Sequence, residues 1–174
     1  MPRNLELKAR LSSQSEAVQF ARSLHARCKG MLLQRDIYYK VSHGRLKLRI
    51  INNHNAELIF YHRPNKKGSR YSDYFILPVN DATRTNALCT SAFGQKGVVE
   101  KKRRLFLFKN SRIHLDVVRG LGTFIEFEVQ VKYGKEQAQK LLELLSHKFN
   151  IRQSSIVSGS YSDLLFNRRR MKKV

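Results

Sequence analysis

The sequence predicts a mainly β (α+β) protein, an eight-stranded antiparallel closed barrel with a few flanking helices. About eight segments alternate apolar and polar residues with the period of two that is typical of strands. Short polar or glycine-containing turns separate many of these segments, as in antiparallel hairpins. Few segments show the apolar spacing of an amphipathic helix. Many short strands with few helices favour a closed barrel.

The expected strands follow one another along the chain. They cover residues 4–11, 36–41, 45–51, 56–63, 70–78, 97–108, 111–118 and 123–132. In the first of them, NLELKARL, the leucines and the alanine share one face, while Glu6, Lys8 and Arg10 share the other. The polar run 52–55 predicts a hairpin turn between two of the later strands. We therefore expect each strand to have one apolar face and one polar face.

The first helix is indicated by a capping box, in which Ser13 and Glu16 form the pattern S-x-x-E. Its apolar stripe includes Cys28, which predicts a core position for that thiol, and the helix is expected to end near Gly30. Two further helices are expected over residues 81–93 and 135–149.

The chain has 174 residues, 34 lysines and arginines against 13 acids, and a formal charge of +21. The length suggests a domain over residues 1–167 with a basic tail at 168–174. Without the five cations of that tail the formal charge is still about +16. The charge predicts an anionic partner: a nucleic acid, a membrane surface or a phosphate-rich small molecule.

The same sequence argues against several other classes of protein. Its N-terminus lacks the apolar run of a signal peptide, and no stretch approaches the ~20 apolar residues of a membrane helix. The two cysteines have no paired spacing, which disfavours a disulfide scaffold and a zinc site. We expect a reduced intracellular compartment, the cytoplasm by default. The basic tail leaves nuclear targeting open.

Charged and polar residues recur on one face of successive strands. They are Glu6, Lys8, Arg10, Arg45, Lys47, Arg49, Tyr61, Arg63, Lys101, Arg103, Arg112, His114, Asp116, Glu126 and Glu128. In one interpretation this face is the wet side of an ordinary sheet. In the other it lines a barrel, where charges need counter-charges, a metal or a polyanion. Like charges side by side destabilise an open sheet, which favours the second interpretation.

Several segments together resemble the CYTH superfamily, the class IV adenylyl cyclases and thiamine triphosphatases also called triphosphate tunnel metalloenzymes. The segments are NLELKARL (4–11), GRLKLRI (44–50), AELIFYHRP (56–64), RIHLDVVRGLG (112–122), TFIEFEV (123–129) and SYSDLL (160–165). The resemblance covers nearly the whole chain and is strongest to the class IV cyclase-like branch. It implies a barrel whose hydrophilic tunnel binds a triphosphate and a divalent metal, Mg²⁺ or Mn²⁺.

The resemblance also implies roles for individual residues. Glu6 and Lys8 match the end of the signature E-x-E-x-K, and Asn4 stands where its first glutamate is expected. The metal ligands are then Glu6, Glu126 and Glu128, and the catalytic residues are Lys8 and Asp116. The phosphate-binding residues are then Lys8, Lys47, Arg49, Arg63, Lys101 and Arg103. Further candidates for this group are Arg10, Arg45 and Tyr161, with Arg10 placed either in the tunnel or at its rim.

These observations predict an enzyme that hydrolyses a triphosphate or cyclises ATP with the help of a divalent metal. Its partner would be a nucleotide, thiamine triphosphate or inorganic triphosphate, and neither a membrane nor a nucleic acid is expected. The oligomeric state stays open. One alternative is a binding module for phosphorylated ligands, in which Asn4 marks lost catalysis. Another is a nucleic-acid-binding protein that uses its tail and outer lysines, with a steep dependence on salt.

Overall fold

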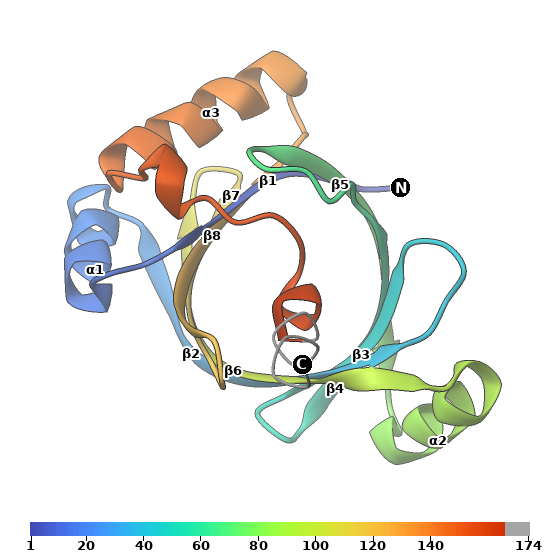
Figure 1. Ribbon diagram of the computed structural model, residues 1–174. Helices are drawn as coiled ribbons and strands as arrows, with labels where there is room; N and C mark the ends of the chain where they lie inside the picture. Colours follow the sequence, from blue (N-terminus) through green and yellow to red (C-terminus); the bar gives the residue numbers. More distant parts are fainter. Residues whose placement is uncertain (166–174) are drawn as a thin grey trace, which may run out of the picture.

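Antiparallel strands close into a barrel in the computed structural model, which describes residues 1–165 (Figure 1). The strands are β1 Arg3–Arg10, β2 Arg27–Tyr39, β3 Arg45–Ile51, β4 Asn55–His62, β5 Arg70–Val79, β6 Gln95–Phe108, β7 Ser111–Val118 and β8 Gly122–Gln130. Their order around the barrel is β1-β5-β4-β3-β2-β6-β7-β8, and β1 pairs with β8 to close it. The predicted fold class and the eight-stranded barrel are confirmed.

Helices α1, α2 and α3 lie outside the barrel, and the first two begin at side-chain caps. Helix α1 (Gln14–Ser23) and helix α3 (Lys135–Lys148) lie on one side of the barrel, and α2 (Ala82–Phe93) lies on another (Figure 1). A short 3-10 helix, η1 (Gln153–Ser155), follows α3. The Ser13 side chain accepts a hydrogen bond from the Glu16 amide at 3.2 Å, and Asp81 accepts one from the Arg84 amide at 2.9 Å. Within the described residues no helix has the length and apolarity needed to cross a membrane.

The predicted extent of the first helix is wrong. Helix α1 stops at Ser23, His25 takes a positive φ of 53°, and strand β2 begins at Arg27. Gly30 does not end a helix: it lies at a shift of register between β2 and β6. The reason is tertiary, because the long strand β6 pairs with the whole of β2 and overrides the helical pattern. Cys28 is consequently exposed rather than part of the core.

The hydrophobic core lies between the outside of the barrel and its helices. Leu5 and Leu7 of β1, Ile125 and Phe127 of β8, and Leu145 of α3 belong to one buried cluster. Burying a leucine or phenylalanine side chain stabilises a fold by about 1.5–3 kcal/mol. Because neighbouring residues of a strand point to opposite faces, this outer core directs the polar residues of every strand into the barrel.

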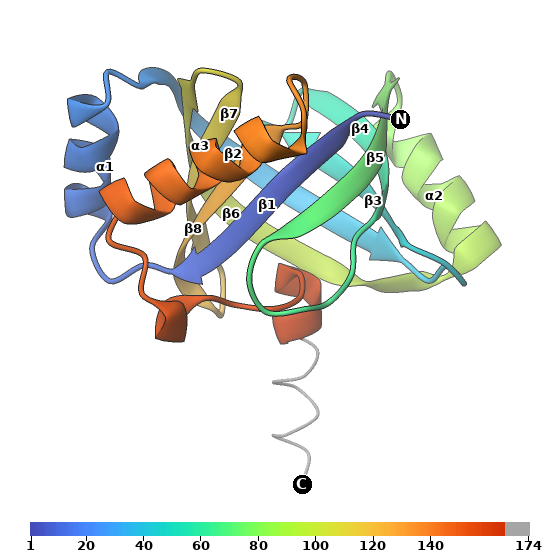
Figure 2. The same cartoon turned by 90° about the horizontal axis from the view of Figure 1, so that it is seen from above.

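A closing segment, residues 156–165, covers one end of the barrel. Figure 1 shows it inside the ring of strands, and Figure 2 shows it beyond their ends. Ile156 forms a β-bridge with Ala9, and the Val157 amide donates a hydrogen bond to the Lys8 carbonyl oxygen at 2.9 Å. A helical turn at 161–165 ends the segment. The predicted tail at 168–174 and the boundary at 167 lie outside the described residues.

The two cysteines offer a test of the corrected β2 strand. We expect a thiol reagent to label Cys28 rapidly in the folded protein and to label Cys89 only after unfolding, because Cys28 is exposed and Cys89 is buried against β2 and β3. Mass spectrometry of the peptides measures both rates. Protection of Cys28 in the folded state would contradict its place on an exposed strand. Equal labelling of both thiols in denaturant is the control.

Candidate active site in the barrel tunnel

A cavity of about 220 Å³ lies inside the barrel, and side chains from all eight strands line it. Ten of the residues given a site role in the sequence analysis face it: Glu6, Lys8, Lys47, Arg49, Arg63, Lys101, Arg103, Glu126, Glu128 and Tyr161. The charged face of the sequence is therefore the inside of the barrel, not the wet side of an open sheet. We call this cavity the tunnel.

Three of the predicted site residues do not line the tunnel. Asp116 is fully buried behind the lining, where it binds Arg103. Arg10 is exposed at the end of β1, and its guanidinium donates a hydrogen bond to the Leu121 carbonyl oxygen at 3.3 Å. Arg45 is turned toward the closing segment, where it contacts Asp163 at 3.0 Å. The structure thus places Arg10 at the rim and Arg45 at the closed end.

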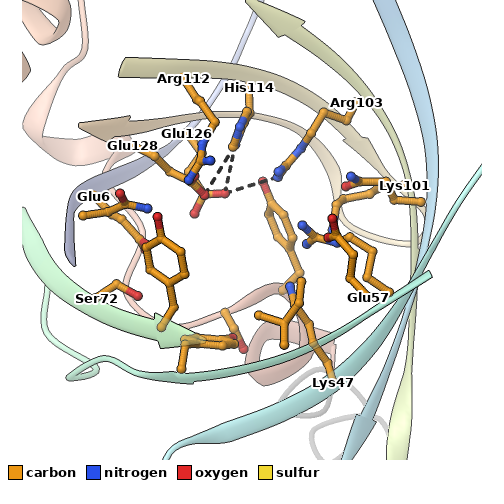
Figure 3. A pocket seen from close by; sticks show the side chains of 18 of the residues that line it. Glu6, Lys47, Glu57, Ser72, Lys101, Arg103, Arg112, His114, Glu126 and Glu128 are labelled. Atoms are coloured by element: carbon orange, nitrogen blue, oxygen red, sulfur yellow. Dashed lines mark hydrogen bonds and ion pairs between the residues drawn. The ribbon is translucent and has the colours of Figure 1, made fainter. Parts of the chain in front are cut away.

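One wall of the tunnel is acidic. Glu6 on β1 lies directly opposite Glu128 on β8, and Glu126 lies one inward position further along β8 (Figure 3). Each carboxylate has a cationic neighbour: Glu6 accepts from Arg63 at 2.7 Å and Glu126 pairs with Lys8 at 3.1 Å. We call Glu6, Glu126 and Glu128, together with their neighbour His114, the acidic wall.

Crowding separates the pKa values of these three carboxyls. Burial raises the pKa of Glu6, and the charges of Glu128 and Glu126 raise it further against the opposing effect of Arg63. Burial also acts on Glu128, but its neighbours His114 and Arg112 outweigh it and bring the pKa of Glu128 to about 2. Glu126 is likewise buried, and its cationic neighbours, Lys8 first, hold its pKa well below the ordinary value. Two of the acids therefore carry full negative charge at neutral pH.

His114 on β7 completes this wall from the other side of β8. It lies directly opposite Glu126 in the β7–β8 pairing, and its side chain is 4% exposed. Burial lowers the pKa of His114, and the charge of Arg103 lowers it further, so the neutral imidazole is favoured. Its Nδ1 atom has no hydrogen-bond partner among the described residues.

The acidic wall fits a divalent metal ion. A ring nitrogen of His114 and one carboxylate oxygen each of Glu126 and Glu128 lie within 4.8 Å of one another. Carboxylate oxygens are the ligands that Mg²⁺ and Mn²⁺ prefer, and a buried imidazole nitrogen without a hydrogen bond is available to join them. Glu6 shares the tunnel with these residues, but its carboxylate is engaged by Arg63.

The opposite wall is basic and is organised by Asp36, a fully buried residue on β2. Its carboxylate accepts from Arg49 at 2.7 and 2.9 Å, from Lys101 at 2.6 Å and from Lys47 at 3.1 Å. Burial raises the pKa of Asp36, but these three cations overcome it and hold the pKa well below the usual range. The single carboxylate of Asp36 thus holds three cationic side chains in place. We call Asp36, Lys47, Arg49 and Lys101 the basic wall.

The lysines of the basic wall lose part of their affinity for protons. Burial lowers the pKa of Lys47 to about 8, and the neighbouring charge of Arg49 acts in the same direction. The pKa of Lys101 is lowered well below its ordinary value, again first by burial. An anion bound in the tunnel would reverse both shifts, because it favours the charged form of each lysine.

Arg103 belongs to a buried network beside the acidic wall. It donates two hydrogen bonds to Asp116, at 2.7 and 2.6 Å, and one to Glu126 at 3.3 Å. The Tyr161 hydroxyl donates to the same aspartate at 2.8 Å, and its ring lies 3.7 Å from the Lys8 ammonium nitrogen. Burial raises the pKa of Asp116, but Arg103 outweighs it and brings the value to about 2.

The closing segment seals the tunnel at one end. Arg63 and Arg70 donate to backbone carbonyl oxygens of this segment, at Gly159 (3.1 Å) and Val157 (3.1 Å) respectively. Asp163 accepts from the Ser160 amide at 2.8 Å and from Arg45 at 3.0 Å. Arginines that reach out of the barrel lining therefore hold the segment in place, and Tyr161 projects from it into the tunnel.

The other end of the tunnel is more apolar. Aliphatic side chains from four strands line it at the ends remote from the closing segment: Leu32, Ile51, Ile76 and Leu105. Arg112, whose side chain is 31% exposed, contributes a charge there and pairs with Glu128 at 2.8 Å. We call this end the mouth. A ligand that enters here meets aliphatic groups together with the Arg112–Glu128 pair.

Several important residues were given no site role in the sequence analysis. Asp36 was missed because the expected strand began there, although its alternation with Ile37 places it on the inner face of a longer β2. Arg70, 1% exposed, was seen only as the start of a strand. His114 shared the parity of Asp116, but only the β7–β8 pairing brings it to Glu126. A correct start for β2 would have revealed Asp36.

Fold and site together define a barrel whose enclosed tunnel has an acidic wall and a basic wall. The CYTH domain model matches residues 2–161 of the chain. The chain therefore belongs to the CYTH family, as the resemblance in its sequence predicted. This membership supports an enzyme that acts on a triphosphate. No curated protein sequence matches the chain significantly.

Solved structures share the fold at low sequence identity. A Pyrococcus horikoshii protein aligns with a TM-score of 0.84 and 22% identity, over 92% of this chain and 98% of that one. A Vibrio parahaemolyticus protein described as an adenylate cyclase candidate gives 0.78 and 16%, over 93% and 97%. A Hippeastrum adenylyl cyclase candidate, described as having a dominant triphosphatase activity, gives 0.67 and 15%, over 95% of each chain.

The basic wall predicts a large effect of one buried aspartate on stability. We expect Asp36→Asn to lower the free energy of unfolding by about 3–5 kcal/mol, because it leaves three buried cations without a counter-charge. Since the pKa of Asp36 is lowered in the folded state, its stabilisation is present at neutral pH and is lost as the pH falls below about 4.

Urea denaturation at pH 7 measures the change. The matched control is Asp73→Asn, which removes the exposed pair between Arg3 and Asp73 and should leave stability almost unchanged. Equal stability of the Asp36 variant and the original protein would contradict the role of Asp36 as organiser of the basic wall.

Proposed function

We propose that this protein is a divalent-metal-dependent enzyme that hydrolyses a triphosphate inside the tunnel. The observation that carries the proposal is the separation of charge across one enclosed cavity, with the acidic wall facing the basic wall (Figure 3). A polyphosphate needs cations for its oxygens, and its metal needs carboxylates. A surface that binds nucleic acid has no use for the acids, because they repel the phosphate backbone.

The basic wall and Arg103 would bind the phosphate chain. Arg49 and Arg103 offer planar guanidinium groups that suit phosphate oxygens, and Lys47 and Lys101 add point charges. Asp36 and Asp116 hold these side chains in fixed positions before a ligand arrives. Cations that are already oriented stabilise the charge that develops on phosphate oxygens in the transition state.

The acidic wall would hold the metal. A divalent ion bound by Glu6, Glu126 and Glu128 would polarise phosphate oxygens as a Lewis acid and orient the chain. Lys8 lies beside Glu126 and below the Tyr161 ring, where its ammonium group can reach a phosphate oxygen. We propose Lys8 and Asp116 as catalytic and positioning residues, Lys8 by contact with the phosphate and Asp116 through Arg103.

Hydrolysis is preferred to ATP cyclisation because it requires less of the site. Cyclisation requires a ribose 3′-hydroxyl held in line with the α-phosphorus, whereas hydrolysis requires only a water molecule at the terminal phosphorus. The triphosphatase activity described for the similar Hippeastrum structure supports the same choice.

A binding module without catalysis is the second candidate, and Asn4 is the observation that favours it. Its side chain lines the tunnel, is 2% exposed, and its Oδ1 atom has no hydrogen-bond partner among the described residues. A carboxylate at this position would add a charged metal ligand, which the amide does not. Tight triphosphate binding without any turnover in Mg²⁺ or Mn²⁺ would favour this candidate.

The metal role of the acidic wall gives a test by substitution. We expect Glu128→Gln to reduce turnover about 100-fold or more, since it removes a charged ligand from the proposed metal site. The assay incubates the protein with tripolyphosphate, ATP or thiamine triphosphate in Mg²⁺ or Mn²⁺ and separates orthophosphate, pyrophosphate and cyclic AMP. Glu143→Gln, on the exposed face of α3, is the control. Full turnover in the folded Glu128 variant would refute the mechanism.

The lowered pKa of Lys47 predicts how binding depends on pH. Below about pH 8 the lysine is charged and attracts the triphosphate, and above that pH it becomes neutral. We expect the affinity for tripolyphosphate to fall about tenfold between pH 7 and pH 9.5, the scale of one charged hydrogen bond. Calorimetry without metal measures it. Lys47→Arg stays charged over this range, so an identical fall in that variant would show that Lys47 is not responsible.

A further inference from the structure

The His114 imidazole stands out because the charged network of the tunnel leaves its Nδ1 atom without a hydrogen bond. The nearest acceptors are Glu128 Oε1 at 3.7 Å and Glu126 Oε2 at 3.8 Å, both beyond hydrogen-bond distance. A buried polar atom with no partner destabilises the fold, so its presence in a well-paired site calls for an explanation.

The spacing of these three atoms is that of ligands around one small ion. Mg²⁺ and similar ions hold their ligands at about 2.1 Å, which puts neighbouring ligand atoms about 3 Å apart and opposite ones about 4 Å apart. The separations from His114 to the two carboxylates, 3.7 and 3.8 Å, fall between these limits. All three groups can therefore reach one ion with small rotations of their side chains.

The strands fix this arrangement from both sides. His114 faces Glu126 across the β7–β8 pairing, and Glu128 is the next inward residue of β8. Arg112 binds Oε2 of Glu128 at 2.8 Å, which turns Oε1 of the same carboxylate toward His114. The nitrogen and the two carboxylates thus converge through the backbone pairing and through a positioning arginine (Figure 3).

We infer that His114 Nδ1 is a metal ligand together with Glu126 and Glu128, and that this nitrogen makes the site prefer Mn²⁺ to Mg²⁺. Mg²⁺ takes oxygen ligands almost exclusively, whereas imidazole nitrogen raises the affinity for first-row transition ions. Asn4, a neutral amide in the same tunnel, offers less charge to a hard ion than a carboxylate would. The inference rests on the proposed metal-dependent function and names the metal class that this site selects.

Pulsed electron paramagnetic resonance of Mn²⁺ bound to the protein without substrate tests the ligand directly. We expect ¹⁴N coupling from a coordinated imidazole, its loss in His114→Asn, and its retention in His147→Asn, a control on the exposed end of α3. Among the described residues, His114 is the histidine that lines the tunnel, so the spectrum of the unmodified protein is informative even if a variant folds poorly. Mn²⁺ binding without ¹⁴N coupling, or no Mn²⁺ binding, would overturn the inference.

Calorimetry with Mn²⁺ and with Mg²⁺ tests the selectivity. We expect His114→Asn to weaken Mn²⁺ binding at least about tenfold and Mg²⁺ binding much less, while His147→Asn changes neither. An unchanged ratio of the two affinities in the folded variant would overturn the inference. These measurements contain no substrate, so their failure leaves the triphosphatase assay to decide the proposed function separately.

Discussion

Every charge buried inside this barrel has to be balanced by another charge inside it, and the rest of the structure depends on that constraint. An unpaired ion in a low-dielectric interior would cost several kcal/mol. The tunnel avoids this cost by pairing its acids with its bases across the strands. Asp36 holds three cations, Asp116 holds Arg103, and Glu126 lies beside Lys8. The strands can turn their charged faces inward only because these pairs exist.

The same pairing produces a site that is asymmetric in charge. The carboxylates of β1 and β8 gather on one wall, and the cations around Asp36 gather on the other. Arg63 extends the network beyond the lining, since it binds both Glu6 and the Gly159 carbonyl oxygen of the closing segment. Closure of the tunnel and order in the acidic wall are therefore coupled through one side chain. A charged ligand that displaces Arg63 from Glu6 would therefore also affect its hydrogen bond to the closing segment.

The exceptions to complete pairing are as informative as the pairs. His114 Nδ1, Asn4 Oδ1 and Gln34 Oε1 are buried in the tunnel lining and have no hydrogen-bond partner among the described residues. Arg63 Nε in the same lining is also unpaired, so the cavity offers a bound ligand both hydrogen-bond donors and acceptors. The acidic wall contributes atoms that could bind a metal ion, and the basic wall contributes positive charges that could bind a polyanion. Metal and phosphate are thus expected in adjoining parts of one cavity.

The sequence alone determined which residues share a face. Its period of two separated the outer core of β1 and β8 from the inner charges, and this predicted the barrel and twelve residues of the tunnel lining. The tertiary structure decided everything that depends on pairing between strands distant in sequence. The pairing of β2 with β6 turned a predicted helical end into a strand and brought Asp36 to Lys101. The pairing of β7 with β8 placed His114 beside Glu126. Local alternation fixes the direction of a side chain, but only the register between strands fixes its neighbour.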